Sequence, residues 1–261
     1  MSEQFKKLPN KTSFLAYKQF LCKSNINVVF LGGYASDMEG KKATYLEELC
    51  RKLKINFLRF DYFAHGMSPG EMDKGNISIW LQNSIDMFEM LSKGNKNILI
   101  GSSMGGWLSL LVALKKKQLV NAIIQIAPAV DFTQELIWNN LNASQKNEMK
   151  KNGHICITKT PEYEQKFSYD LVADGLQHLL FSKEKIDISC PVHILHGLKD
   201  EVVPYEISLK LMNRLISKEV ILHILKDSGH RMSEVKDLEI LGQSLRILVQ
   251  NLQLQNKPSD C

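Results

Sequence analysis

A serine set between glycines is the feature of this sequence that most directly suggests chemistry. Ser103 is the central residue of Gly101-Ser-Ser-Met-Gly105, which fits the pattern G-x-S-x-G. An apolar run ending at Ile100 precedes it, and an apolar segment with helical spacing begins near Met104. A sharp strand-to-helix turn exposes such a serine and aims the helix N-terminus at the reaction centre. We predict that Ser103 is a nucleophile, with Ser102 as the nearby alternative.

A serine hydroxyl needs a base to take its proton, and His230 is the predicted base. It follows the last predicted strand, 220–224. Catalytic loops emerge at the carboxyl ends of parallel strands, so His230 should arrive at the same sheet edge as Ser103. His196, at the end of another strand, is a minor candidate for lining the site. The other histidines considered are predicted to pack in strands (His193, His223) or to lie in an insertion (His154, His178).

The base in turn needs a carboxylate that fixes its tautomer and stabilises the imidazolium. Asp200 follows the predicted strand 192–195, and the chain order Ser103, Asp200, His230 suits a hydrolase built on a parallel sheet. Glu201 is the neighbouring alternative. Asp131, which follows the strand ending near Ala129, is a second one.

Negative charge that develops on a substrate oxygen needs fixed hydrogen-bond donors. One predicted donor is the backbone N–H of Met104, directly after the nucleophile. The other is the backbone N–H of Tyr34, in the Gly32-Gly33-Tyr34 loop after the strand 27–31.

Short β-rich runs alternate with segments of helical period from residue 27 onward. Near-continuous apolar strands are typical of a parallel sheet buried on both faces, and the alternation predicts right-handed βαβ units. The expected fold class is therefore α/β, a doubly wound, mostly parallel sheet. Residues 5–20 are expected to add an antiparallel hairpin at one edge. The predicted strands cover 27–31, 56–61, 97–100, 122–126, 192–195 and 220–224.

The stretch 131–188 interrupts this alternation and contains no convincing strand. It is polar and favours helix, so we expect a small helical cap inserted into a single domain spanning 1–261. Large apolar residues within it should face the core and form the wall of a substrate cleft. Phe132 and Trp138 are the candidate substrate-binding residues. The full apolar set is Phe132, Leu136, Ile137, Trp138, Tyr163, Phe167 and Tyr169.

Composition excludes several other classes of function. Apolar residues make up 44% and charged residues 23% of the 261 residues, the balance of a soluble globular protein. The formal charge of +5 is spread over short clusters, so no nucleic-acid partner is expected. The five cysteines form no C-x-x-C pair and the histidines no metal-binding spacing, so we expect neither a metal nor another cofactor. We expect no membrane span and a cytoplasmic location, with the mitochondrial matrix as the alternative if a transit peptide has been removed.

Taken together, these motifs resemble the α/β-hydrolase superfamily. Asp61 to Ser68 is similar to its D-x-x-x-H-G-x-S segment. A more specific resemblance is to the mitochondrial palmitoyl-protein thioesterases, also called mycophenolic acid acyl-glucuronide esterases, and their bacterial relatives. It rests on Leu31–Gly40, Phe60–Tyr62, Gly101–Gly106, Ala127–Thr133, Asp174–Leu180, Cys190-Pro191, His196–Pro204 and Gly229–Arg231. Two positions depart from the pattern, Gly32 and Ala64.

This resemblance implies a serine hydrolase that cleaves carboxylic esters or thioesters through an acyl-enzyme, with Ser103, Asp200 and His230 as the catalytic triad. The implied partner is a small acyl ester or thioester, or an S-acylated protein. Two alternatives stay open at this point. One is a non-catalytic binding protein of the same fold, and the other is a hydrolase of peptides or lactones.

Overall fold

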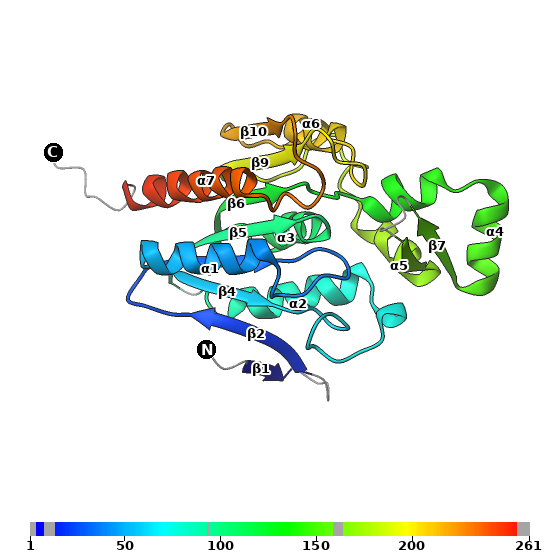
Figure 1. Ribbon diagram of the computed structural model, residues 1–261, viewed down its shortest axis with the longest axis horizontal. Coiled ribbons are helices and arrows are strands. Elements are labelled where there is room, and N and C mark those ends of the chain that lie inside the picture. The colour runs from blue at the N-terminus through cyan, green and yellow to red at the C-terminus, as the bar shows by residue number, and fades with distance from the viewer. Residues whose placement is uncertain (1–3, 8–13, 93, 159–163, 255–261) are drawn as a thin grey trace.

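An eight-stranded sheet, parallel in all but its first two pairings, forms the centre of the protein (Figure 1). The computed structural model describes residues 4–7, 14–92, 94–158 and 164–254. The strand order is β1-β2-β4-β3-β5-β6-β9-β10. β1 and β2 are antiparallel neighbours, as expected for the edge hairpin, and β2 is also antiparallel to β4. The strands are β1 Gln4–Lys7, β2 Phe14–Phe20, β3 Ile26–Leu31, β4 Asn56–Phe60, β5 Lys96–Ser102, β6 Val120–Ile126, β9 Val192–Gly197 and β10 Val220–Leu225.

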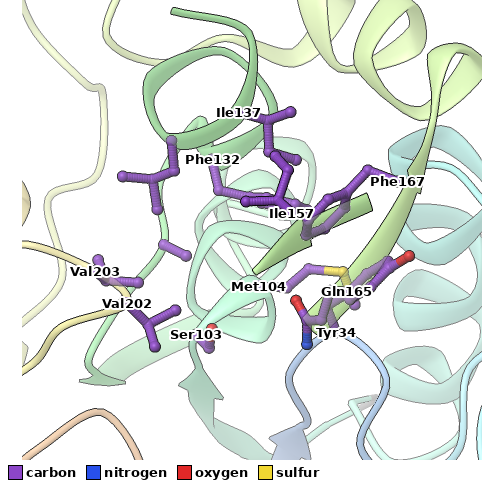
Figure 2. Close-up of a pocket in the computed structure, with 12 residues that line it drawn as sticks. Tyr34, Ser103, Met104, Phe132, Ile137, Ile157, Gln165, Phe167, Val202 and Val203 are labelled. Carbon is purple, nitrogen blue, oxygen red and sulfur yellow. The ribbon is translucent and has the colours of Figure 1, made fainter. Parts of the chain in front are cut away.

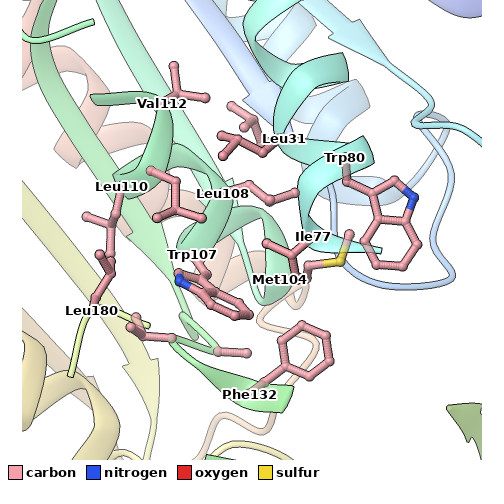
Figure 3. Packing of buried hydrophobic residues seen from close by; sticks show 14 of the residues in the cluster. Leu31, Ile77, Trp80, Met104, Trp107, Leu108, Leu110, Val112, Phe132 and Leu180 are labelled. Carbon is pink, nitrogen blue, oxygen red and sulfur yellow. The ribbon is translucent and has the colours of Figure 1, made fainter. Parts of the chain in front are cut away.

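Helices cover both faces of this sheet, so the predicted α/β class and doubly wound sheet are confirmed. Leu46 of α1 and Leu245 of α7 pack with Ile98 of β5 on one face. Trp80 of α2, Leu108 of α3 and other buried residues form the apolar layer on the opposite face (Figure 3). All the residues of β3, β4 and β9 are buried, which explains their near-continuous apolar sequences. The helices are α1 Lys41–Leu53, α2 Ile77–Glu89, α3 Met104–Lys115, α6 Glu206–Arg214 and α7 Val235–Leu254.

The chain between β6 and β9 leaves the sheet at the carboxyl ends of the strands, on the right in Figure 1. We call this inserted segment the cap. It begins with a π-helical turn, Thr133–Ile137, and a 3-10 turn, Trp138–Asn140. Further along come α4 Ala143–Asn152, β7 His154–Thr158, β8 Glu164–Ser168, α5 Tyr169–Gly175 and a 3-10 turn Leu176–His178.

The expectation that 131–188 contains no strand is wrong. β7 and β8 form a separate antiparallel pair, in which Ile155 lies opposite Phe167. Both of these side chains are buried. Each strand has only five residues and several polar ones, so its alternation is too short to stand out from a polar, helix-favouring stretch. These strands are stabilised by burial against the core, which the local sequence pattern does not reveal.

Candidate active site

Ser103 lies in a strained turn between β5 and α3. Its φ of 54° and ψ of −119° are unusual for a residue with a side chain. Its N–H donates to the Ile126 carbonyl at 2.9 Å, which ties the turn to β6. Glycine is required at Gly105 because an added Cβ would lie 2.1 Å from the Leu31 carbonyl oxygen. Close packing of the turn on β3 thus aims the Ser103 hydroxyl away from the sheet.

The structure brings His230 and Asp200 to this serine, although both come from later loops. His230 Nε2 lies 3.1 Å from Ser103 Oγ, and His230 Nδ1 lies 2.8 Å from Asp200 Oδ2. A carboxylate accepts hydrogen bonds, so Nδ1 carries the proton and Nε2 is left to accept the serine hydroxyl. The three side chains form a continuous hydrogen-bonded chain.

Asp200 is held as a buried anion, with its carboxylate side chain 1% exposed. One oxygen, Oδ1, accepts the backbone N–H groups of Val202 and Val203 at 2.9 and 2.8 Å. Burial acts to raise the pKa of Asp200, but hydrogen bonds from His196 and His230 outweigh it and hold the pKa well below its usual range. The carboxylate is therefore ionised at neutral pH.

The two alternative acids lie elsewhere. Glu201 is exposed at the neighbouring outer surface. Asp131 points toward the end of the cap, where it accepts the N–H groups of Leu180 and Phe181. Burial outweighs these hydrogen bonds and raises the pKa of Asp131 to about 6. Asp131 therefore acts as a structural link between β6 and the returning cap.

The β3–α1 loop lies directly beside the serine. A Cβ added to Gly33 would be 3.4 Å from Ser103 Cβ. The N–H of Ala35 is already used, because it donates to His65 Nε2 at 3.1 Å. Tyr34, between these two residues, lines the same pocket as Ser103 and Met104 (Figure 2). The two residues predicted to donate backbone N–H groups thus flank the serine.

The D-x-x-x-H-G-x-S segment supports that loop from behind. Asp61 accepts the N–H of Met38 at 2.7 Å and that of Met67 at 2.9 Å. His65 Nδ1 lies 3.0 Å from the Phe63 carbonyl, so Nδ1 is protonated and Nε2 can accept from Ala35. Burial lowers the pKa of His65, which keeps the ring neutral as this arrangement requires. These residues shape the loop without reaching the serine.

An apolar pocket opens from Ser103 and runs beneath the cap (Figure 2). Of the apolar cap residues singled out in the sequence, Phe132, Leu136, Ile137 and Phe167 line it. Sequence reasoning missed Ile157 and Gln165, from the unpredicted hairpin, and Val202 and Val203, which follow Asp200. The period-two pattern of Ile155 and Ile157 was the available signal. Tyr34, Ser103, Met104 and Ala129 complete the lining.

Trp138, predicted as a substrate-binding residue, does not line this pocket. Its ring lies 6.1 Å from that of Tyr169, and the ammonium groups of Lys146 and Lys150 lie over it. Successive residues in a helical turn point about 100° apart. Ile137 therefore enters the pocket while Trp138 turns to the outer side of the cap. Tyr163 lies outside the described residues.

Tyr34 also connects the loop to the cap. Its hydroxyl donates to the Lys166 carbonyl of β8 at 2.8 Å, and its ring lies 5.1 Å from that of Phe167. Burial, with a smaller contribution from Asp73, raises the pKa of Tyr34 to about 12, so the hydroxyl remains protonated as a donor.

The remaining histidines have structural surroundings. His193 and His223 lie in β9 and β10, as predicted. His178 Nε2 lies 2.7 Å from Ser78 Oγ and so ties the cap to the start of α2. His196 does not line the pocket but is buried behind Asp200. Within the described ranges, no three His, Cys, Asp or Glu side chains are grouped to hold a metal ion, and no helix is long and apolar enough to cross a membrane.

A doubly wound parallel sheet with a serine elbow, and with a histidine and an acid on the following strand-end loops, defines the α/β-hydrolase class. The sequence model of the prolyl oligopeptidase family matches residues 85–253. The chain is 34% identical to the mitochondrial palmitoyl-protein thioesterase ABHD10 of Rattus norvegicus, over 95% of this chain and 82% of the relative. It is 33% identical to the Homo sapiens protein of the same name, over 94% of this chain and 78% of that one.

A solved structure agrees with these sequence matches. The mouse α/β hydrolase domain-containing protein 10 superposes with a TM-score of 0.89 at 31% identity, covering 97% of this chain and 100% of that one. The chain therefore belongs to the α/β-hydrolase superfamily and, within it, to the family of the ABHD10 thioesterases. It is a hydrolase, as the sequence resemblance implied.

Proposed function

We propose that this protein is a serine hydrolase that cleaves carboxylic esters and thioesters with Ser103, His230 and Asp200 as its catalytic triad. The single observation that carries the proposal is the hydrogen-bonded chain from Ser103 Oγ through both ring nitrogens of His230 to Asp200 Oδ2. Its order and lengths meet the requirement for a nucleophile, a base and an orienting acid.

The reaction proceeds through a covalent intermediate. Ser103 Oγ attacks the substrate carbonyl carbon while His230 Nε2 takes the hydroxyl proton. The N–H groups of Tyr34 and Met104 stabilise the oxyanion of the tetrahedral intermediate. The intermediate then collapses, and His230 returns the proton to the leaving alcohol or thiol, which leaves an ester on Ser103. Water, deprotonated by His230, then attacks the acyl carbon; the bond from that carbon to Ser103 Oγ breaks, His230 returns the proton to Oγ, and the carboxylic acid leaves.

The acyl group occupies the apolar pocket beneath the cap, with Phe132 against the chain. An apolar wall favours hydrocarbon over charged groups, and each buried methylene contributes about 0.8 kcal/mol, roughly fourfold in affinity. The names of the relatives support a long-chain thioester, including an S-acylated protein, as substrate. The chemistry uses side chains and water, so it requires no cofactor.

Labelling and a chain-length series test this function. A fluorophosphonate probe should label the wild-type protein and fail to label Ser103→Ala, whereas Ser102→Ala should label normally. With p-nitrophenyl esters and S-acyl thioesters below KM, kcat/KM should climb from acetyl to at least octanoyl. Absence of labelling would leave a non-catalytic binding protein. A maximum at acetyl with no turnover of longer chains would leave a small-ester hydrolase.

Peptide hydrolysis is the second candidate, because the matching family model is that of the prolyl oligopeptidases. The same triad would act on an amide, and the substrate would have to enter an apolar pocket. Comparing octanoyl p-nitroanilide and a proline-containing peptide anilide with the matched octanoyl ester separates the two. Faster turnover of the peptide anilide than of the ester would favour the peptidase.

Domain organisation and location complete the proposal. We propose a single domain in which the 131–188 insertion serves as the cap, because this segment and the sheet-end loops line one pocket. For location, we retain the cytoplasm as the prediction from sequence and the mitochondrial matrix as its alternative, the latter supported by the names of the relatives. Fractionation of cells that express the tagged protein would decide between them.

A further inference from the structure

His196 is a fully buried histidine that, like His230, lies beside the acid of the proposed triad. It lies near the end of strand β9, just before the loop that carries Asp200, and its side chain is 0% exposed. Its Nε2 lies 3.2 Å from Asp200 Oδ2, the same oxygen that accepts His230 Nδ1–H at 2.8 Å. One carboxylate oxygen is thus shared by two imidazole rings.

The neighbours of His196 determine where its proton lies. Nε2 is 2.9 Å from the Val203 carbonyl oxygen, which can only accept, so Nε2 carries a hydrogen. Nδ1 is 2.7 Å from Ser208 Oγ in α6. In the neutral ring Nδ1 accepts the Ser208 hydroxyl, and Nε2–H donates to the Val203 carbonyl while Nε2 also lies 3.2 Å from Asp200 Oδ2. Both ring nitrogens therefore have partners, which belong to the β9–α6 loop and to α6.

We infer that His196 is a positioning residue for catalysis, which holds the Asp200 carboxylate ionised and aimed at His230. This inference rests on the proposed function. The backbone N–H groups of Val202 and Val203 satisfy Asp200 Oδ1. The ring nitrogens of His196 and His230 both lie near Oδ2, so His196 can keep that oxygen in place when His230 changes its charge during turnover. Ser208, in turn, selects the His196 tautomer that can donate.

Replacing the donor should weaken catalysis without changing substrate binding. His196→Phe fills the space but donates nothing, and a lost hydrogen bond to a charged group corresponds to about a 10- to 100-fold fall in kcat. KM should stay unchanged, because His196 does not line the pocket. Without His196, the Asp200 carboxylate stabilises the positive charge of protonated His230 less well. The rise of kcat/KM on the acidic side of the pH profile, called the acidic limb here, should therefore move to lower pH. His196→Gln, whose amide nitrogen can replace Nε2, should recover most of kcat and the position of the limb.

Controls distinguish positioning from packing. His193→Phe replaces another buried histidine of β9, on the other face of the strand, and should leave kcat and the pH limb at wild-type values. Ser208→Ala removes one hydroxyl and should lower kcat a few-fold, with the same direction of shift in the limb. It serves as the second variant if His196→Phe does not fold.

The inference is overturned if folded His196→Phe, or Ser208→Ala where the former does not fold, keeps both the wild-type kcat and the wild-type pH limb. It is also overturned if His196→Gln is as impaired as His196→Phe at equal thermal stability, because packing alone would then explain the loss. Ser103→Ala, assayed in parallel, separates this result from failure of the proposed function. Full activity of that variant would reject the triad itself, and the role of His196 with it.

Discussion

The sheet edge and the cap contribute to one site in different ways. At the sheet edge, Ser103, Asp200 and His230 each follow a parallel strand, and backbone geometry and hydrogen bonds fix their positions. The cap supplies apolar side chains from short turns and a two-stranded hairpin, and polar contacts such as Tyr34–Lys166 and Ser78–Asp174 join it to the core. If the proposed function holds, the reaction chemistry depends on the sheet, whereas selection of the acyl group depends on the cap.

Removing the nucleophile should produce the largest effect and should involve only the sheet edge. Ser103→Ala is expected to lower kcat by roughly 10⁴- to 10⁶-fold, and His230→Ala by a similar factor, because the triad acts as a unit. Asp200→Asn should cost roughly 10⁴-fold by favouring the wrong tautomer of His230. Steady-state kinetics together with circular dichroism checks this. If Ser102→Ala inactivated the enzyme and Ser103→Ala did not, the elbow assignment would be wrong.

Narrowing the pocket beneath the cap should change the preference for acyl-chain length and leave the hydrolysis of short esters unchanged. Ile157 lines the pocket from β7, and Ile157→Trp should exclude the last two or three methylenes of an octanoyl chain. At roughly fourfold per methylene, kcat/KM for the octanoyl ester should fall about 10- to 100-fold, with acetyl ester turnover unchanged. Lys151→Trp, at an exposed position of α4, is the matched control. An equal loss for acetyl and octanoyl esters would contradict a division of labour between the two regions.

The sequence predicted the sheet edge well because strand ends obey general rules. Ser103, Asp200 and His230 could be placed from three apolar runs and from the convergence of parallel strands at one edge. Ile157 could not, because the five-residue strand that carries it is stable only when packed on the core. The inward turn of Ile137 and the outward turn of Trp138 depend on tertiary packing in the same way. The contact of His196 with Asp200 arises from a loop that folds back on its own strand, which spacing alone does not reveal.

The free energy of unfolding should depend on pH because Asp131, at the junction between the sheet and the cap, gains or loses a proton. Its pKa is raised from 3.8 to about 6, so between these values the native state keeps a proton that the unfolded chain has released. The contribution of Asp131 to the free energy of unfolding should therefore fall as pH rises from about 4 to about 6. A shift of about two pH units corresponds to about 3 kcal/mol.

Asp131→Asn cannot ionise and should lose this dependence. Urea denaturation of both proteins from pH 4 to pH 7 should show the variant gaining stability relative to the wild type as pH rises. If the unfolding free energies of the two proteins changed with pH in the same way, Asp131 would not be the group that titrates.

The smallest expected changes in stability come from replacing one glycine in each region by alanine. Gly105→Ala would push a Cβ into the Leu31 carbonyl and should cost about 1–3 kcal/mol of unfolding free energy, with loss of activity. Gly153 ends α4 at a φ of +77°, with open space around it. Gly153→Ala should therefore cost only about 1 kcal/mol, from backbone strain, and should leave acetyl ester turnover intact. Thermal denaturation and esterase assays of both variants test the contrast. Equal costs would show that the cap is as tightly constrained as the elbow.

Tyr34 makes the two regions mechanically interdependent. Its main chain belongs to the loop beside Ser103, while its hydroxyl is fastened to the Lys166 carbonyl in the β7–β8 hairpin. Any displacement of β8 away from the loop must break that bond or move the loop with it. One side chain thus couples the position of the β7–β8 hairpin to the loop beside Ser103, so that a shift in either one is transmitted to the other.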